Sequence, residues 1–397
     1  MLPRISIIGA GPSGLVLASL FHRSKIPFTI YDLRSRPSPG LVNIPSGSLD
    51  LHVESGQRAL AECGLLHAFR SLTVECSEEH IICDRFGDIK FEAPNHNEER
   101  PEISRNSLIE LLLSSLPENI IQWERKIQSV SPNPSNPHQQ IITFQNGKSH
   151  SCDLVIGADG AWSKVRPLLT DVKPYFSGVH WMTLTIPNIT QRFPEIAKMI
   201  GTGTFWALGG KRFVLSQRGS MDSARVYVAI HNKDINYCND AGLNSLDLEQ
   251  IKEKNLGESG IFADFGKGVK ELLEKGLEEE KTPQFLQMHM LPTDHTWEHK
   301  ANATLVGDAA HLMTPFAGEG VNSAMLDALE LAQGIIAAVN KDTSISDAVR
   351  EYEKKMFVRA KENAEDTWTN MEKIFEDSAP KAIVEWFNSF SAPPGQR

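Results

Sequence analysis

A glycine-rich turn near the N-terminus constrains the fold more than any other feature of the sequence. An apolar run typical of a buried strand, Ile5–Ile8, leads directly into residues 9–14 (GAGPSG), where a helical segment begins. Gly9 permits a tight turn, Gly11 lets the backbone approach a pyrophosphate, and Gly14 allows a helix to pack closely on a strand. The pattern predicts a parallel, doubly wound sheet that opens strand–helix–strand.

An acidic residue after the second predicted strand indicates a nucleotide ligand for this turn. The strand covers Phe28–Tyr31, and Asp32 follows it at the spacing where a carboxylate binds ribose hydroxyls. The helix N-terminus adds about half a positive charge for the phosphates. The segment therefore predicts dinucleotide binding, with a purely structural glycine-rich turn as the alternative. Arg34 is either a contact for adenosine or a nicotinamide-cofactor phosphate, or a solvated loop arginine.

The charge balance and the cysteines exclude several classes of function. Lys and Arg number 40 against 50 Asp and Glu, a net charge of −10, so nucleic acid is not an expected partner. Five scattered cysteines without a Cys-x-x-Cys pair argue against a disulfide framework or a zinc site and favour the cytoplasm. No stretch approaches the ~20 apolar residues that cross a bilayer, so no membrane association is expected. We predict no metal site, and a monomer.

Changes of pattern along the chain predict four segments. Residues 1–172 form the first part of the nucleotide-binding domain. Strand-like, turn-rich text over 173–290 predicts a substrate-binding sheet inserted into that domain. Residues 291–340 return to the nucleotide-binding domain, and 341–397 are C-terminal helices. The predicted fold class is α/β, with a Rossmann-like domain and an inserted, mostly antiparallel β-sheet domain.

Two further glycine-rich segments follow predicted strands. Residues 307–311 (GDAAH) come after a strand over 304–306 and precede residues 315–322 (PFAGEGVN), which open a long helix. Residues 157–166 (GADGAWSKVR) come after a strand over 154–156. Glycines let backbone amides approach a planar ring, and a helix N-terminus stabilises negative charge on it.

With these three motifs in this order, the chain resembles the FAD-dependent monooxygenases of the para-hydroxybenzoate hydroxylase superfamily (group A). Residues 47–52 (GSLDLH) and 101–106 (PEISRN) look most like the tetracycline-inactivating flavin monooxygenases. The resemblance implies that Asp308 binds the ribityl chain of FAD and that the glycine-rich loop after it packs on the flavin ring. Taken with the first motif, it implies FAD contacts from the following residues: Gly9, Gly11, Gly14, Asp32, Arg34, Asp50, Arg105, Asp159, Asp308, Pro315, Gly318, Gly320 and Asn322.

The chain also departs from those relatives. It has Asn43 where they use an arginine for NADPH, and Glu319 where they have a glutamine in the flavin loop. In the inserted sheet, Arg212 matches an arginine that contacts the antibiotic, but Tyr227 takes the place of a histidine. Arg212 and Tyr227 are thus the expected substrate contacts, and these departures argue against tetracycline as the natural substrate.

The resemblance implies a reaction in which NADPH, or NADH, reduces FAD and the reduced flavin reacts with dioxygen. The resulting flavin hydroperoxide would hydroxylate or epoxidise a bulky, partly apolar small molecule, such as a secondary metabolite or an antibiotic. Because the cofactor carries the chemistry, no catalytic side chain is predicted. The alternatives are a dehydrogenase or oxidase that inserts no oxygen, a halogenase whose Trp-x-Trp-x-Ile-Pro motif is missing here, and a carrier that sequesters its ligand.

Overall fold

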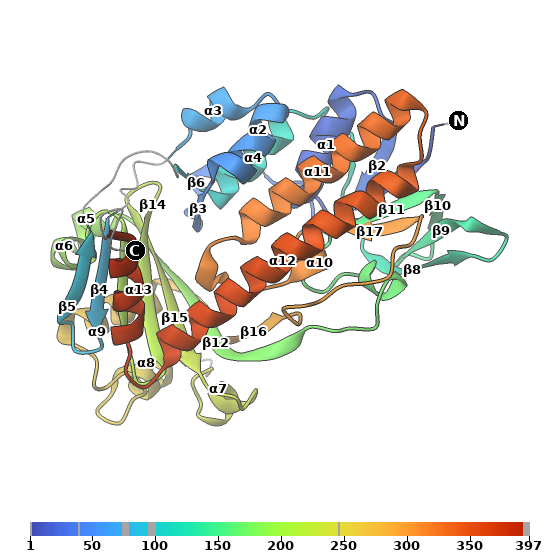
Figure 1. Cartoon of the computed structure of the whole chain (residues 1–397). Coiled ribbons are helices and arrows are strands. Elements are labelled where there is room, and N and C mark those ends of the chain that lie inside the picture. The colour runs from blue at the N-terminus through green and yellow to red at the C-terminus, as the bar shows by residue number, and fades with distance from the viewer. Residues whose placement is uncertain (1, 39, 74–78, 94–100, 245–246, 392–397) are drawn as a thin grey trace.

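The computed structural model describes residues 2–38, 40–73, 79–93, 101–244 and 247–391, and it contains a parallel sheet and a larger, mostly antiparallel one (Figure 1). All pairings in the parallel sheet are parallel, which confirms the Rossmann-like half of the predicted fold. Its strand order is β17 (Ala303–Leu305), β11 (Leu154–Gly157), β1 (Ile5–Ile8), β2 (Phe28–Tyr31) and β7 (Ile121–Gln122).

Helices cover the parallel sheet and connect its strands. On one side α1 (Pro12–Arg23) packs against α11 (Gly320–Lys341) and α4 (Arg105–Ser114), with the short α2 (Arg58–Glu62) and α3 (Leu66–Arg70) beside them (Figure 1). The N-cap of α4 is Ser104, whose hydroxyl accepts a hydrogen bond from the backbone N–H of Ser107.

The larger sheet has seven strands and forms the other half of the molecule. Its order is β16 (Leu286–Met290), β12 (Tyr175–Ile186), β15 (Ser223–His231), β14 (Arg212–Gly219), β13 (Thr204–Gly209), β4 (His80–Asp84) and β5 (Ile89–Ala93). Only the β13–β4 pairing is parallel. The sequence placed residues 80–93 in the nucleotide-binding part. They join this sheet because β4 pairs with β13, a strand about 120 residues later in the chain. No local sequence pattern encodes a pairing over that distance.

The two faces of the seven-stranded sheet have different neighbours. Alternate residues, among them Val214 and Val226, point into a core shared with one group of helices. Phe213 and Ala229 point the opposite way, toward the nucleotide-binding half and the C-terminal helices. The first group of helices comprises α5 (Ile189–Arg192), α6 (Pro194–Ile200), α7 (Tyr237–Asp240), α8 (Leu248–Leu256) and α9 (Lys267–Glu279).

One long helix joins the two halves. The 31 residues of α12 (Ile345–Phe375) run along α11 and then reach the seven-stranded sheet, where α13 (Lys381–Ser391) packs beside the end of α12 (Figure 1). At ~1.5 Å per residue such a helix is roughly 45 Å long, enough to span both halves. None of the helices within the described ranges is both long and apolar enough to cross a membrane.

Short elements fill the space between the sheets. Two antiparallel strands, β3 (Ser48–Asp50) and β6 (Glu102–Ser104), lie next to β14, and the π-helical turn η2 (Val53–Gln57) follows β3. Elsewhere, β8 (Ile127–Asn133), β9 (Asn136–Phe144) and β10 (Ser149–Cys152) form a separate three-stranded antiparallel sheet. The other short elements are η1 (Leu41–Asn43), η3 (Arg166–Leu168), α10 (Asp308–His311) and η4 (Pro315–Ala317).

Candidate functional site

The turn after β1 has glycines for two different steric reasons. A Cβ built on Gly14 would lie 1.9 Å from the carbonyl oxygen of Gly9, and a Cβ on Gly9 would lie 2.2 Å from that of Ala158. These two positions therefore accept only glycine. A Cβ on Gly11 would meet no described atom within 4 Å. The backbone at Gly11 is thus open to a ligand at the N-terminus of α1, as pyrophosphate binding requires.

Asp32 and Arg34 brace this turn from the end of β2. Asp32 is 4% exposed, and its carboxylate accepts hydrogen bonds from the Ala10 N–H (2.7 Å) and the Arg34 guanidinium (2.8 and 2.9 Å). Burial by itself would raise the pKa of Asp32, but the hydrogen bonds from Arg34 and Ala10 lower it below its ordinary value. Arg34 also donates to the Ala10 carbonyl (3.2 Å). Both predicted residues therefore lie at the mouth of the glycine-rich turn.

A buried arginine ties the other two motifs together. Arg166 is 4% exposed and donates to three backbone carbonyls: from Nε to Ala309 (2.8 Å), from Nη2 to Asp308 (3.0 Å) and from Nη1 to Ala161 (3.0 Å). These contacts fix the segment after β11 against the segment after β17. Sequence reasoning quoted Arg166 within a motif but assigned it no role, because nothing local distinguishes a buried arginine from a surface one.

Two carboxylates lie in the space between these motifs. One oxygen of Asp159 accepts the Lys164 N–H, whereas the other is buried and has no hydrogen-bond partner among the described residues. Burial raises the pKa of Asp159. The side chain of Asp308 can be reached by solvent, but many protein atoms lie around it and partly remove water from the carboxylate. This desolvation raises the pKa of Asp308, against the opposing effect of the positive charges of His311 and Arg105. An accessible carboxylate such as that of Asp308 suits a ligand rich in hydroxyl groups, for example the ribityl chain of FAD.

The loop before α11 presents open backbone. Pro315 begins the 3-10 turn η4, and Gly318 ends it with a left-handed φ of 73°. A Cβ on Gly318 or Gly320 would meet no atom within 4 Å in the part of the chain that the structure describes. Backbone amides at the N-terminus of a 22-residue helix are therefore accessible here, which fits a flat, electron-accepting ring.

Asn322 holds that loop in place rather than presenting its side chain. It is fully buried, and its amide oxygen accepts the His52 N–H (2.9 Å) and the Ser55 hydroxyl (3.2 Å). Its amide nitrogen donates to the Asp50 carbonyl (2.9 Å). Asp50 and Asn322, which were predicted separately, are therefore brought together across 272 positions.

A buried ionic network supports the loop from below. The Asp327 carboxylate is fully buried and contacts His311 Nε2 (2.5 Å), the Gly307 N–H (2.9 Å) and Arg359 Nη2 (2.9 Å). Burial would lower the pKa of His311, but the adjacent Asp327 carboxylate raises it above its ordinary value. No local sequence pattern indicates this network, because its members lie on α10, α11 and α12.

Arg105 and Tyr227 face the same space from opposite halves. Arg105 starts α4, is exposed, and lies close enough to Asp308 and Tyr227 for its charge to affect the pKa of both. Tyr227 lies on β15 with its ring 5.2 Å from that of Trp181 on β12. Burial raises the pKa of Tyr227. The predicted cofactor residue and the predicted substrate residue are thus neighbours.

Arg212 lies on the far face of the seven-stranded sheet. On β14 it is an odd number of positions from Leu215, the cross-strand partner of Tyr227, so its side chain points away from the nucleotide-binding half. It forms an ion pair with Asp264 (2.7 Å) and lies over the ring of Phe265. The structure therefore does not bring Arg212 and Tyr227 to one pocket.

A cavity of about 600 Å³ lies between the halves. Its wall combines Trp181 and Met288 of the sheet with Trp162, which lies within one FAD motif, and with Leu312 and Met313, which directly follow another. Polar positions on the same wall are Thr183, Glu280, Thr282, Gln284, Gln287 and His289. Sequence reasoning did not select any of these residues, because single aromatic and methionine residues in strands are usually core.

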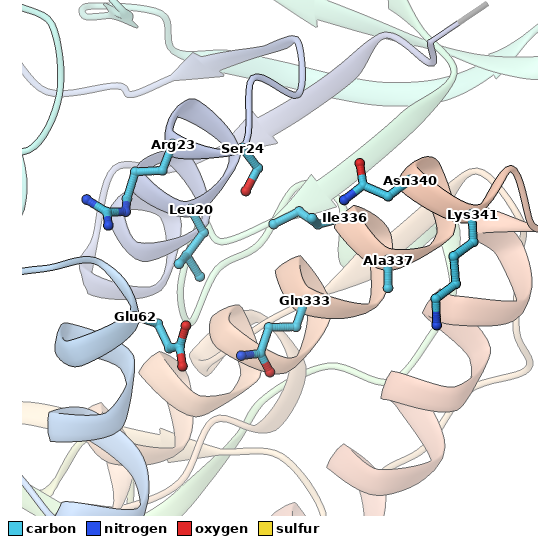
Figure 2. Close-up of a pocket in the computed structure, with 9 residues that line it drawn as sticks. All are labelled: Leu20, Arg23, Ser24, Glu62, Gln333, Ile336, Ala337, Asn340 and Lys341. Atoms are coloured by element: carbon cyan, nitrogen blue, oxygen red, sulfur yellow. The ribbon is translucent and has the colours of Figure 1, made fainter.

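A second groove of about 750 Å³ lies elsewhere, between the ends of α1, α2 and α11 (Figure 2). Figure 2 shows Arg23, Glu62 and Lys341 around it. Its α11 residues begin at Gln333, 13 positions beyond Gly320, which places the groove ~20 Å along the helix from the loop. We assign the reactive site to the first cavity, which adjoins the motifs.

Comparisons with known proteins agree with this geometry. The FAD binding domain family matches residues 4–236 and 293–367. The monooxygenase penA of Penicillium thymicola is 36% identical over 421 residues, covering 96% of this chain and 97% of the relative. Among solved structures, tetracycline destructase Tet(51) has a TM-score of 0.71 at 18% identity, covering 98% of this chain and 95% of that one. Klebsiella pneumoniae HpxO, solved with FAD and uric acid, has a TM-score of 0.75 at 18% identity, covering 99% and 94%.

The fold, the three motifs and the matched family lead to one conclusion. The chain belongs to the FAD-dependent monooxygenases of the para-hydroxybenzoate hydroxylase superfamily.

Proposed function

We propose that this enzyme uses NAD(P)H and dioxygen to hydroxylate or epoxidise a bulky, partly apolar small molecule bound between its two halves. The observation that carries the proposal is the cavity of about 600 Å³, which lies between the sheet and the segments that flank the FAD motifs. Its volume suits a ligand of several fused or linked rings. Its wall of Trp162, Trp181 and Met288, with a few polar groups, suits a secondary metabolite of the alkaloid or polyketide kind.

FAD, when bound, supplies the electron transfer and the activation of oxygen. The chain positions it. We propose that the open backbone at Gly11 receives the pyrophosphate, that Asp308 and Asp159 accept ribityl hydroxyls, and that the loop around Gly318 packs on the ring. The remaining predicted contacts stay proposals of the same kind. We assign no catalytic acid or base.

On the substrate side, the residues orient the ligand and exclude water. The ring centroid of Trp181 lies 5.2 Å from that of Tyr227 and 6.0 Å from that of Phe316, which belongs to the flavin loop. Aromatic side chains therefore connect the sheet to the proposed position of the flavin ring. The Tyr227 hydroxyl offers a polar contact for the substrate, and its raised pKa keeps it protonated as a donor. A dry pocket of this kind limits wasteful release of the activated oxygen as peroxide.

NADPH is the proposed reductant, with NADH as the alternative, although Asn43 stands where the resembled family has its arginine. We propose a monomer in the cytoplasm. The four cysteines within the described ranges, Cys63, Cys83, Cys152 and Cys238, are buried and free, which fits a reducing compartment.

The test is turnover of the purified, FAD-loaded enzyme with NADPH, NADH and a panel of polycyclic phenols, aryl alkaloids and tetracycline. We expect at least one panel member to accelerate NADPH oxidation and to yield a product heavier by one oxygen atom. A product lighter by two hydrogen atoms would instead indicate a dehydrogenase. Binding of panel members without any NAD(P)H oxidation would indicate a carrier and contradict the proposal.

A further inference from the structure

A buried histidine lies between three carboxylates beside the flavin loop. His52 follows β3, and its side chain is 4% exposed. Its Nε2 atom is 3.0 Å from Asp50 Oδ2, and its Nδ1 atom is 3.5 Å from Glu319 Oε1 and 3.8 Å from Glu54 Oε1. Its backbone N–H also donates a hydrogen bond to the side-chain oxygen of Asn322. His52 therefore contacts the strand, the turn and the loop that surround the proposed ring position.

Both ring nitrogens of His52 face carboxylate oxygens, and this bears on which protonation state of the ring is favoured. An ionised carboxylate can only accept hydrogen bonds. A neutral imidazole carries one N–H and would turn a lone pair toward either Asp50 or Glu319. Both contacts are favourable together only when both nitrogens of His52 carry hydrogen. Carboxylates on both sides of the ring therefore favour the imidazolium form, which carries a charge of +1.

Glu319 lies at the N-terminus of α11, where its negative charge would affect reduction of the bound flavin. It is the N-cap residue of α11, and its side chain is 29% exposed. The helix N-terminus favours negative charge in a ligand, but a carboxylate at the same end competes with that ligand. Reduction of FAD by a hydride transfers two electrons and one proton, so the ring that was neutral gains one negative charge. An uncompensated Glu319 would oppose this step.

We propose that His52 is a positioning residue that neutralises Glu319 at the N-terminus of α11 and thereby sets the reduction potential of the bound flavin. The contact with Asp50 keeps the imidazolium fixed on the side of β3. The positive charge of the imidazolium thus offsets part of the negative charge of the surrounding carboxylates, which leaves more of the field of the helix available to the reduced ring. The inference rests on FAD binding and not on the proposed substrate.

The test compares His52→Gln, Glu319→Gln and the double variant, each loaded with FAD. Their flavin reduction potentials are measured anaerobically against reference dyes, and FAD dissociation constants are measured by flavin fluorescence. Glu54→Gln is the matched control, because Glu54 faces the same imidazole at 3.8 Å but is 75% exposed and screened by water.

The proposal predicts shifts of opposite sign. Glu319→Gln removes a negative charge beside the proposed ring position and raises the potential, and His52→Gln removes a positive charge there and lowers it. We expect each reduction equilibrium to change about tenfold, which is about 30 mV for a two-electron couple. The double variant returns close to the wild-type potential, and Glu54→Gln changes it several times less than Glu319→Gln.

Shifts of the same sign in both single variants, or unchanged potentials, would overturn the proposal. In a purely structural role, both single variants would weaken FAD binding without an opposite effect on the potential. Should His52→Gln fail to fold, Glu319→Gln and Glu54→Gln still decide the question, since only the first is expected to raise the potential. Turnover on any substrate is not needed, so failure of the proposed substrate class would not affect the result.

Discussion

The two halves of the molecule build their parts of the site in different ways. In the nucleotide-binding half, the glycine-rich turns that receive the cofactor come from short motifs whose residues are steric neighbours, as with Gly9 and Gly14. In the other half, Trp181 and Tyr227 come from strands paired across the sheet, and Met288 comes from a third strand. The first arrangement is expected to keep binding the same cofactor, because the close backbone contacts at Gly9 and Gly14 do not tolerate other residues. The second can change residue by residue, so substrate choice is expected to depend on it.

The largest effect should follow from a side chain at the tightest point of the first half. In Gly14→Val the Cβ would lie 1.9 Å from the Gly9 carbonyl oxygen, and backbone must move to relieve the contact. We expect loss of FAD and of cooperative unfolding, measured by flavin absorbance and calorimetry. Gly11→Ala is the control: it meets nothing within 4 Å among the described residues. Gly11→Ala should keep the fold and bind FAD more weakly. Equal loss of FAD binding and of cooperative unfolding in both variants would contradict the distinction between a steric role for Gly14 and a ligand-facing role for Gly11.

The next largest effect should come from the network below the flavin loop. Asp327→Asn leaves the buried His311 and the partly buried Arg359 without their shared carboxylate. Breaking a buried ion pair from one side typically costs about 3–5 kcal/mol of stability. Urea denaturation of the FAD-free protein measures the loss directly. A loss below ~1 kcal/mol would show that the network does not support the loop.

The same network has a pH dependence with a defined sign. Because Asp327 raises the pKa of His311 above 6.5, the contribution of His311 to stability is complete below pH 6.5 and is lost as pH rises through the raised value. The lowered pKa of Asp327 adds stability that is present above pH 3.8 and is lost as pH falls through the lowered value. The unfolding free energy of the wild type should therefore decrease above pH 6.5 more steeply than that of His311→Gln.

A moderate effect confined to substrate is expected in the second half. Trp181→Ala removes the ring between Tyr227 and Phe316. We expect KM for an accepted substrate to rise about tenfold, which is ~1.4 kcal/mol, with FAD affinity changed less than twofold. More peroxide should be released per NADPH, as the pocket becomes wetter. Trp181→Phe should recover most of both values, whereas loss of FAD from Trp181→Ala would show that the halves are not separable.

The smallest effect should distinguish the two faces of the sheet. Arg212→Met removes a partly exposed ion pair with Asp264 and should cost ~1 kcal/mol or less, with kcat/KM unchanged. Tyr227→Phe removes only a hydroxyl and should lower kcat/KM severalfold. Steady-state kinetics on one substrate compares the two variants. A larger kinetic effect from Arg212→Met would restore the contact expected from the sequence resemblance.

How far the sequence predicts this molecule differs between its halves. The strand–turn–helix around Gly9 and the loop at Gly318 follow from residues that are adjacent in the chain, so local patterns suffice. The pairing of β4 with β13, and the meeting of Asp50 with Asn322, depend on contacts between distant segments that no periodicity encodes. Arg212, expected to contact the same substrate as Tyr227, lies on the other face of the sheet, because the face that a strand residue occupies depends on its register, which the sequence alone leaves undetermined.

The most direct test of the central claim is the fate of molecular oxygen. The FAD-loaded enzyme is supplied with NADPH and a panel substrate under ¹⁸O₂, and the product is analysed by mass spectrometry. We expect one labelled oxygen atom in each product molecule, with the second atom of dioxygen released as water. Product formed without label, or only hydrogen peroxide and unchanged substrate across a panel whose members bind, would contradict it.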